Sequence, residues 1–386
     1  MILVKGCEIF CPAYLGKKDL LIAGSKIASI TDSINISGIP DLEVIDGKGL
    51  KLVPGFIDSH VHIAGAGGEG GPATRTPEMQ MSHMLEGGIT TVIGCQGTDG
   101  FTRRLESLLM KAKALRQEGV SAYILTGSYQ VPPPTILGDI AKDLALIEEV
   151  VGVGEIAVSD HRSSCPTLDE LKKIAAQARV GGMLGGKAGV VNIHLGDAKD
   201  PFRPLYEVVA SSELKIKQFF PTHCNRNHHI VEESKSFGKS GFIDLTAASY
   251  PDSSNNELKP SKVIIKLLKA GVPTEHLTIS SDGFGSLPHF DENGKLVGLE
   301  MGYPKSIFVE FSDCIQKEKI EIESALKFVT SNVADIFGLK TKGRIAVGND
   351  ADLVLLNSNL DLVHLVAMGK MMVKNGVMLK KGNYEK

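Results

Sequence analysis

The stretch VPGFIDSHVH at residues 53–62 combines strand-forming residues with two closely spaced histidines. Because side chains alternate along a strand, His60 and His62 project to the same face. Two imidazoles on one side of a strand, with Asp58 two residues earlier, form half of a metal site. A lone His-x-His pattern is equally compatible with polar residues at a strand end, one of them buried. Metal binding is favoured here because further candidate ligands recur at the ends of later strands.

Composition and charge are those of an ordinary globular protein. The 386 residues are 42% hydrophobic and 23% charged, with both signs interspersed around a net charge of -3. This balance predicts no nucleic-acid partner, and no apolar run reaches the roughly 18 residues of a membrane span. The N-terminus lacks a basic start followed by a long apolar run, so we expect no signal peptide. The six cysteines complete no zinc ribbon, which predicts reduced thiols and a cytoplasmic location.

From residue 53 onward, strand-like apolar runs alternate with amphipathic helical patterns. Alternating units of this kind imply an α/β fold with a parallel sheet and right-handed crossovers. Eight units over roughly 250 residues match a (β/α)8 TIM barrel. A doubly wound open sheet is the alternative, but the regular repeats and the missing dinucleotide fingerprint weigh against it. The predicted strands span residues 52–62, 89–95, 121–129, 155–160, 190–196, 218–224, 242–250 and 276–282.

Caps and glycines mark the helix boundaries. Thr76, followed by a proline, predicts a helix that begins at residue 77 and ends at the glycine pair 87–88. Thr167 opens a capping box, and the helix after it is expected to stop at the glycine pair 181–182. The range 318–337 has the pattern of the last barrel helix.

The two ends of the chain differ from its middle. Both consist of short strand patterns separated by turns, which predicts one small β-sandwich built from both termini. The sequence therefore predicts a small domain of residues 1–52 and 343–386 and a (β/α)8 barrel of residues 53–342 that holds the candidate metal ligands.

Metal-capable side chains gather at the carboxyl ends of the predicted strands, where barrels hold their catalytic residues. Imidazole and carboxylate ligands without thiolates suit zinc. The candidates exceed what one catalytic ion needs, so two metals with a bridging group are expected. These candidates are His60, His62, Glu155, His194, His223 and Asp282.

Further motifs resemble those of the isoaspartyl (β-aspartyl) dipeptidases of the amidohydrolase superfamily. They occur in order over nearly the whole chain, which makes the match specific. The superfamily motifs are PGFIDSHVH at 54–62 and GNDADLV at 348–354, and the narrower ones are GGEGGP at 67–72, LTGSY at 125–129, SDHRS at 159–163, PTHCNRN at 221–227 and SSDGFGS at 280–286.

The resemblance implies a zinc metallopeptidase with two Zn²⁺ ions per subunit. The pair His60 and His62 would hold the more buried ion together with Asp282, and the remaining two histidines the second ion. Family members commonly bridge the metals with a carboxylated lysine on strand four, but this chain has Glu155 there. A glutamate supplies the same pair of anionic oxygens. Lys187 is the nearest rival, but it precedes strand five.

The expected reaction is the hydrolysis of a β-aspartyl dipeptide. A water shared by two zinc ions becomes hydroxide near neutral pH and would attack the amide carbonyl. Asp282 is placed to take the proton of this water and to deliver it to the leaving amine. The resemblance assigns Tyr129 as hydrogen-bond donor to the developing oxyanion.

Charged residues beside the ligands predict a substrate with two carboxylates and one amine. Arg162 and Arg226 can pair bidentately with carboxylates, Glu69 can pair with an ammonium group, and Ser286 could donate a further hydrogen bond. Another amidohydrolase activity, such as cyclic-amide hydrolysis or N-acyl-amino-acid deacylation, is the alternative. A non-catalytic scaffold of the same fold would be expected to have lost ligands. The resemblance also implies a homo-oligomer, with an octamer as one form.

Overall fold

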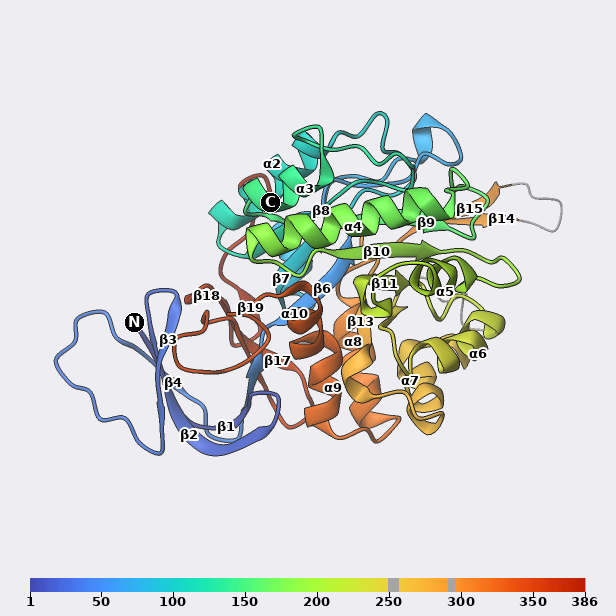
Figure 1. The fold of residues 1–386 in the computed structure, drawn as a ribbon. Helices are drawn as coiled ribbons and strands as arrows, with labels where there is room; N and C mark the ends of the chain where they lie inside the picture. The colour runs from blue at the N-terminus through green and yellow to red at the C-terminus, as the bar shows by residue number, and fades with distance from the viewer. Residues whose placement is uncertain (249–256, 291–295, 386) are drawn as a thin grey trace.

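The computed structural model describes residues 1–248, 257–290 and 296–385. Its larger part is built on parallel strands, as the alternating sequence pattern predicts (Figure 1). Within these residues, six strands pair in the order β11-β10-β9-β8-β7-β6, and two more form the pair β12-β13. The strands are β6 (Phe56–Val61), β7 (Ile89–Gly94), β8 (Ser121–Thr126), β9 (Val150–Val158), β10 (Val190–Leu195), β11 (Phe219–Thr222), β12 (Ile243–Thr246) and β13 (Leu277–Ser280).

Backbone hydrogen bonds link the larger parallel sheet to the β12-β13 pair at both edges. After β11, the Cys224 N–H donates to the Asp244 carbonyl of β12 over 3.1 Å. Beside β6, the Asp282 N–H donates to the His60 carbonyl over 3.0 Å, and the His62 N–H donates to the Gly283 carbonyl over 2.8 Å. The carboxyl ends of β6 and β13, which are far apart in the sequence, therefore lie next to each other.

Helices connect the strands and pack on the outside of the sheet, as α4 does along β9 and β10 (Figure 1). Of the helices in the described ranges, none combines the length and apolar character needed to cross a membrane. The hairpin of β14 (Ser286–Phe290) and β15 (Leu296–Met301) follows β13. The helices are α1 (Met81–Leu85), α2 (Leu105–Glu118), α3 (Ile140–Leu146), α4 (Leu168–Gly185), α5 (Arg203–Ala210), α6 (His228–Phe237), α7 (Pro260–Lys269), α8 (Ser306–Gln316), α9 (Ile322–Val329) and α10 (Ser331–Phe337), with short 3-10 turns at Pro72–Thr74, Ile216–Gln218 and Thr274–His276.

Two predicted helices have different boundaries. Helix α1 begins at Met81 rather than at residue 77. The Thr76 hydroxyl donates to the Phe284 carbonyl over 2.7 Å, so it ties two loops together instead of capping a helix. The predicted helix 318–337 forms α9 and α10, because the backbone at Thr330 leaves the helical conformation.

Helix α4 begins at the predicted capping box but does not stop where the sequence suggested. It continues past Gly181 and Gly182 to Gly185. A Cβ atom on Gly181 would lie 2.7 Å from the Cα atom of Ala141 in α3. These glycines therefore allow α3 and α4 to pack closely rather than ending the helix.

The predicted strand 52–62 is two strands in two different sheets. β5 (Lys51–Pro54) pairs with strands from both chain ends, whereas β6 belongs to the parallel sheet. Gly55 separates them and lies against Thr90, whose hydroxyl oxygen would be 2.2 Å from a Cβ atom at this position. A side chain could not fit there, so the glycine allows the chain to change sheets within one residue.

The fourth parallel strand begins earlier than predicted. β9 spans residues 150–158 instead of 155–160, so Gly152 and Gly154 lie inside it. A Cβ atom at these positions would lie 2.8 and 2.6 Å from the carbonyl oxygens of Val190 and Asn192 in β10. The glycines serve this close approach of two backbones. The end of the predicted strand 242–250, beyond residue 248, lies outside the described residues.

Both ends of the chain build one mixed sheet. Figure 1 shows the blue N-terminal strands and the red C-terminal strands at the same side of the molecule. In the described part of the chain their order is β19-β18-β17-β16-β5-β1-β2-β3, with β4 paired to β1. Apolar side chains such as Ile22, Leu52 and Leu353 form its core. The strands are β1 (Ile2–Phe10), β2 (Tyr14–Ala23), β3 (Lys26–Thr31), β4 (Glu43–Asp46), β16 (Leu353–Leu356), β17 (Leu362–Ala367), β18 (Lys370–Lys374) and β19 (Val377–Met378).

A buried lysine joins the terminal sheet to the parallel sheet. The Lys342 Nζ atom lies 2.6 Å from Asp352 Oδ2 and 3.0 Å from Asp350 Oδ2, and it donates to the Ser121 hydroxyl of β8 over 2.6 Å. Its side chain is 2% exposed. Burial alone would lower the pKa of Lys342, but Asp352 and Asp350 outweigh burial and raise it, so the ammonium stays charged.

We expect Lys342→Met to destabilise the protein by about 3–5 kcal/mol, because it leaves the buried Asp352 carboxylate without its cation, while Asp350 keeps its ion pair with Lys26. Arg344→Met removes the exposed ion pair with Asp335 and should cost at most about 1 kcal/mol. The measurement is the free energy of unfolding in urea for both variants. Equal losses would show that Lys342 does not neutralise a buried charge.

Candidate active site

The structure brings the sequence-predicted metal ligands together at the carboxyl ends of the parallel strands. The Glu155 carboxylate is at the centre: its Oε1 atom lies 2.6 Å from His194 Nδ1 and 3.0 Å from His223 Nε2, and its Oε2 atom lies 3.4 Å from His60 Nε2. All four side chains are buried. One carboxylate therefore reaches imidazoles from β6, β10 and the end of β11.

The other two candidates complete this arrangement. Asp282 follows β13, and its Oδ1 atom lies 3.1 Å from His62 Nε2 and 3.8 Å from His60 Nε2. Burial alone would raise the pKa of Asp282, but the hydrogen bond with His62 and the nearby imidazoles outweigh burial and lower it. The carboxylate is therefore ionised and can coordinate a cation or accept a proton.

A β-bulge in β9 aims Glu155 into the site. Val191 of β10 pairs with Val153, and Ile193 pairs with Ile156, so β9 has one more residue than β10 between these pairs. Bulges of this kind redirect side chains and are common beside active sites. Glu155 is inside the bulge and is fully buried.

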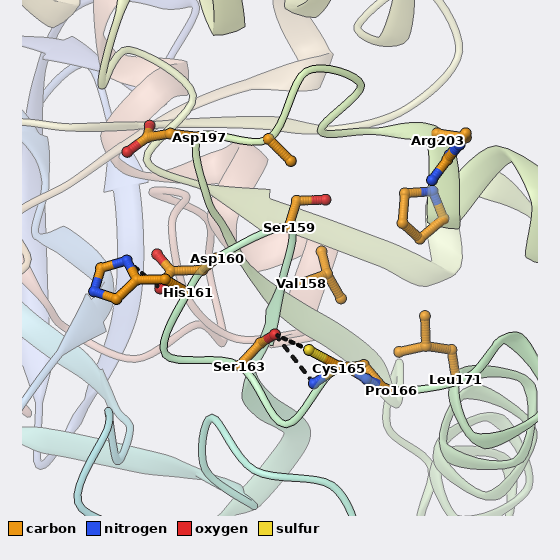
Figure 2. Close-up of a pocket in the computed structure, with 12 residues that line it drawn as sticks. Val158, Ser159, Asp160, His161, Ser163, Cys165, Pro166, Leu171, Asp197 and Arg203 are labelled. Atoms are coloured by element: carbon orange, nitrogen blue, oxygen red, sulfur yellow. Dashed lines mark hydrogen bonds and ion pairs between the residues drawn. The ribbon is translucent and has the colours of Figure 1, made fainter.

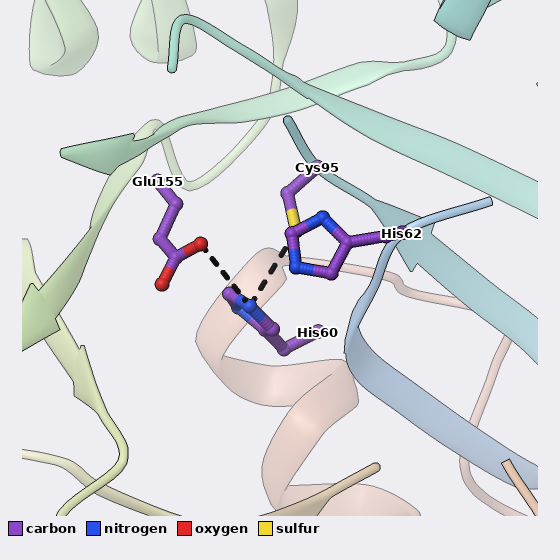
Figure 3. Close-up of side chains that lie close together, drawn as sticks. All are labelled: His60, His62, Cys95 and Glu155. Atoms are coloured by element: carbon purple, nitrogen blue, oxygen red, sulfur yellow. Dashed lines mark hydrogen bonds and ion pairs between the residues drawn. The ribbon is translucent and has the colours of Figure 1, made fainter. Parts of the chain in front are cut away.

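The donor set fits a metal centre. The described residues contain two groups of closely placed donor atoms, one of His60, His62, Cys95 and Glu155 and the other of Glu155, His194 and His223. The members of the first group point toward one another in Figure 3. Among the described atoms, the buried Glu155 Oε2 atom has no hydrogen-bond partner. A buried carboxylate oxygen in this condition is costly unless a cation or donor compensates it.

The electrostatics of the site favour the deprotonated forms of Glu155 and His223. Burial alone would raise the pKa of Glu155, but the His60 and His194 imidazoles outweigh burial and hold it well below its usual range. Burial lowers the pKa of His223 to about 3, although the hydrogen bond with Glu155 opposes this shift. The imidazole of His223 is therefore neutral and has a lone pair available for a metal.

Tyr129 lies over His194, with its hydroxyl 2.6 Å from His194 Nδ1. Burial, followed by the negative charge of Glu155, raises the pKa of Tyr129 well above its usual value. The phenol therefore keeps its proton and can donate a hydrogen bond to an anionic oxygen near the metal ligands.

The two predicted substrate-binding arginines converge on Asp160. Arg162 lies 3.0 Å from this carboxylate through both Nε and Nη2, and Arg226 Nη1 lies 3.3 Å from it. The Asp160 Oδ2 atom also lies 3.0 Å from His194 Nε2. Glu69 is near the same group, 3.7 Å from Arg162 Nη1. One carboxylate therefore connects a candidate metal ligand to both arginines.

A surface pocket lies beside Asp160. Asp160 lines this pocket together with His161, Ser163 and Cys165, which belong to the loop that follows β9 (Figure 2). Ser286 is half-buried at the start of β14 and lines a different surface hollow, beside Arg75. The structure therefore places Ser286 at the edge of the group rather than among the arginines.

Several residues of the site escaped sequence reasoning. Asn192 Oδ1 lies 3.2 Å from His60 Nδ1, and Thr246 Oγ1 lies 2.8 Å from His223 Nδ1. Partners on these nitrogens leave Nε2 of each ring directed at the ligand cluster, which is how outer groups orient metal ligands. Asp160 and Cys95 were missed as well, although both lie at strand ends, where polar residues deserve a functional interpretation.

The position of Lys187 excludes it as the bridge. Its Nζ atom donates to the Ile147 carbonyl over 2.5 Å, at the turn that precedes β9. That turn is at the amino end of the strand, away from the ligands at its carboxyl side. Glu155 is the bridging candidate that the structure places between the histidines.

Known proteins resemble this chain along its full length. A model of the amidohydrolase family matches residues 212–381. A β-aspartyl dipeptidase from Fervidobacterium islandicum AW-1, crystallised with the dipeptide β-Asp-Leu, is 43% identical with a TM-score of 0.93, covering 100% of this chain and 98% of that one. A second structure of a β-aspartyl dipeptidase from the same organism is 41% identical with a TM-score of 0.89 and full coverage of both chains. The dihydroorotase of Elusimicrobium minutum is 24% identical over 94% of this chain and 89% of that protein.

We expect Glu155→Ala to lose bound metal, because both donor groups share this carboxylate. Metal per chain, measured by mass spectrometry after purification, should fall from two ions to at most one. Lys187→Ala is the matched control and should retain both, and added bicarbonate should not improve reloading of the metal-depleted wild type. If Lys187→Ala loses metal while Glu155→Ala keeps it, the bridge has been assigned to the wrong residue.

Proposed function

This chain belongs to the β-aspartyl dipeptidase family of the amidohydrolase superfamily, and we propose that it is a zinc-dependent dipeptidase that hydrolyses β-aspartyl dipeptides. The observation that carries the proposal is the position of Glu155 between two groups of histidines, next to two arginines that converge on one point. Glu155 and its histidines would hold two metal ions, and the two arginines would bind an anionic substrate.

We also infer the finer architecture. The hydrogen bonds at both edges of the β12-β13 pair support a complete (β/α)8 barrel of residues 53–342. The mixed sheet of the two termini supports a small β-sandwich domain of residues 1–52 and 343–386. A cytoplasmic location follows from the cysteine usage, and a homo-oligomer such as an octamer follows from the family resemblance.

The metal ligands divide into two sets. When bound, two zinc ions would polarise the scissile carbonyl and acidify a water molecule. Glu155 belongs to both sets, because its two oxygens face different histidines. His60, His62 and Asp282 would hold one ion, and His194 and His223 would hold the other.

Asp282 and Tyr129 handle the proton and the developing charge. The ionised Asp282 carboxylate accepts the proton of the attacking water and then delivers it to the leaving amine. The protonated Tyr129 hydroxyl donates to the carbonyl oxygen as it becomes negative, which stabilises the transition state more than the ground state. Both residues are buried, which strengthens these interactions.

Recognition of the substrate depends on its charged ends. Asp160 holds the Arg162 guanidinium through Nε and Nη2, while Nη1 extends toward Glu69. A β-aspartyl dipeptide carries two carboxylates and one ammonium group, which suit two arginines and one glutamate. An α-linked dipeptide presents its amine one carbon nearer the amide, so its carbonyl would be displaced from the reacting water.

Cyclic-amide hydrolysis is the second candidate, because the chain is 24% identical to a dihydroorotase. A cyclic amide such as dihydroorotate has one carboxylate and no ammonium group. Turnover of dihydroorotate at a rate equal to that of β-Asp-Leu would favour this second function.

We expect the wild type to prefer β-Asp-Leu over α-Asp-Leu by about a hundredfold in kcat/KM, since a misplacement of about 1 Å can cost that much. Arg226→Ala should lower kcat/KM for β-Asp-Leu at least about tenfold, because it removes a charged hydrogen bond. Arg203→Ala is the control, since this exposed arginine pairs with Glu207 on α5. Equal rates on the two linkages, or an unaffected Arg226→Ala, would exclude a β-aspartyl-specific enzyme.

A further inference from the structure

Cys95 lies inside the candidate metal centre. It is the first residue after β7, its side chain is buried, and its Sγ atom lies 3.6 Å from His60 Nε2 and 3.8 Å from His62 Nδ1. Figure 3 shows the sulfur beside the two imidazoles, with Glu155 approaching the same His60 nitrogen from the left. No sequence motif considered above assigns a function to this thiol.

The distances fit metal coordination. A tetrahedral zinc with bonds of about 2.3 Å to sulfur and about 2.0–2.1 Å to nitrogen separates these two ligand atoms by about 3.5 Å. The separation between Cys95 Sγ and His60 Nε2 is 3.6 Å. The donor atoms of His60, His62, Cys95 and Glu155 all lie within 4.8 Å of one another. A single ion could therefore contact all four residues.

A second observation points to a cation at the same place. The Glu155 Oε2 atom is buried, faces His60 at 3.4 Å and has no hydrogen-bond partner among the described atoms. A carboxylate oxygen and a thiol sulfur that approach the same imidazole nitrogen are unfavourable neighbours once both are ionised. A divalent cation between them removes that repulsion.

Another buried cysteine provides the contrast. Cys224 immediately follows His223, but its Sγ atom points to the Pro221 carbonyl at 3.5 Å. It therefore occupies an ordinary buried position, with a backbone acceptor for its proton. Cys95 has two imidazoles at comparable distances instead.

We propose that Cys95 is a thiolate ligand of the metal ion held by His60 and His62. This inference rests on the metal centre of the proposed function. Binding would exchange the thiol proton for a sulfur–metal bond and release that proton. Because a thiolate is soft and donates charge, this ion would be a weaker Lewis acid than the one at His194 and His223. The second ion is then the better partner for the substrate carbonyl.

The test is cobalt substitution in the full-length enzyme. Metal-depleted wild type, Cys95→Ala and Cys224→Ala are reloaded with Co²⁺, and the near-ultraviolet absorption is recorded. Wild type and Cys224→Ala should show a thiolate-to-cobalt charge-transfer band, and Cys95→Ala should lack it. Cys95→Ala should also lose one of its two ions to a competing chelator at least tenfold more readily. A fully loaded wild type without the band, or a band that persists in Cys95→Ala, would overturn the assignment.

A measurement on the wild type alone covers the case in which Cys95→Ala does not fold. Cadmium-113 NMR of the cadmium-loaded enzyme should give one resonance shifted downfield by a sulfur ligand and one typical of nitrogen and oxygen ligands. Two resonances of the second kind would exclude thiolate coordination. Hydrolysis of β-Asp-Leu without the cobalt band would overturn the Cys95 assignment and leave the proposed function intact. The band without hydrolysis would support the assignment and contradict the proposed function.

Discussion

The burial of the Glu155 carboxylate is the constraint on which the site depends. A buried anion costs several kcal/mol unless opposite charge or hydrogen-bond donors compensate it. Compensation here comes from imidazoles on three different strands, with His194 and His223 within 3.0 Å of one oxygen. The sheet must therefore hold these strands in one register, and the bulge in β9 must turn the glutamate inward. A change in either would leave an uncompensated charge in the interior.

Asp160 extends this constraint from the candidate metal ligands to Arg162 and Arg226. It accepts from His194 Nε2, and so fixes the ring whose Nδ1 faces Glu155. The same carboxylate engages Arg162 and Arg226. Burial would raise the pKa of Asp160, but its hydrogen bonds with His194 and Arg162 outweigh burial and lower it strongly, so the group stays ionised. The orientation of a candidate metal ligand and the positions of the two arginines are thus coupled through Asp160, and both arginines also contact His194 Nε2 directly.

The sequence predicted correctly those features that depend on residues close together in the chain, such as strand alternation and helix caps. The alternation along 53–62 placed both histidines on one face, and the capping box at Thr167 placed the start of α4. Predictions failed where distant segments meet. Gly55 and Gly154 lie where the backbone comes close to another strand, and the residues next to them in the sequence do not indicate this contact. Cys95 was missed for the same reason, because its partners are side chains that β6 brings beside it.

The parallel strands have a buried charged group at each end, but only one of the two groups is fully paired within the protein. At the amino end, Lys342 pairs with Asp352 and Asp350 and contacts Ser121 of β8. Lys26 also pairs with Asp350, so two lysines match the two carboxylates. At the carboxyl end, Glu155 keeps one oxygen without a hydrogen bond from any described residue. A matched buried charge stabilises the contact between the terminal sheet and the parallel strands. A buried charge that is only partly paired, as at Glu155, lowers the stability of the fold. Such a cost is expected at a site where a bound cation would complete the pairing.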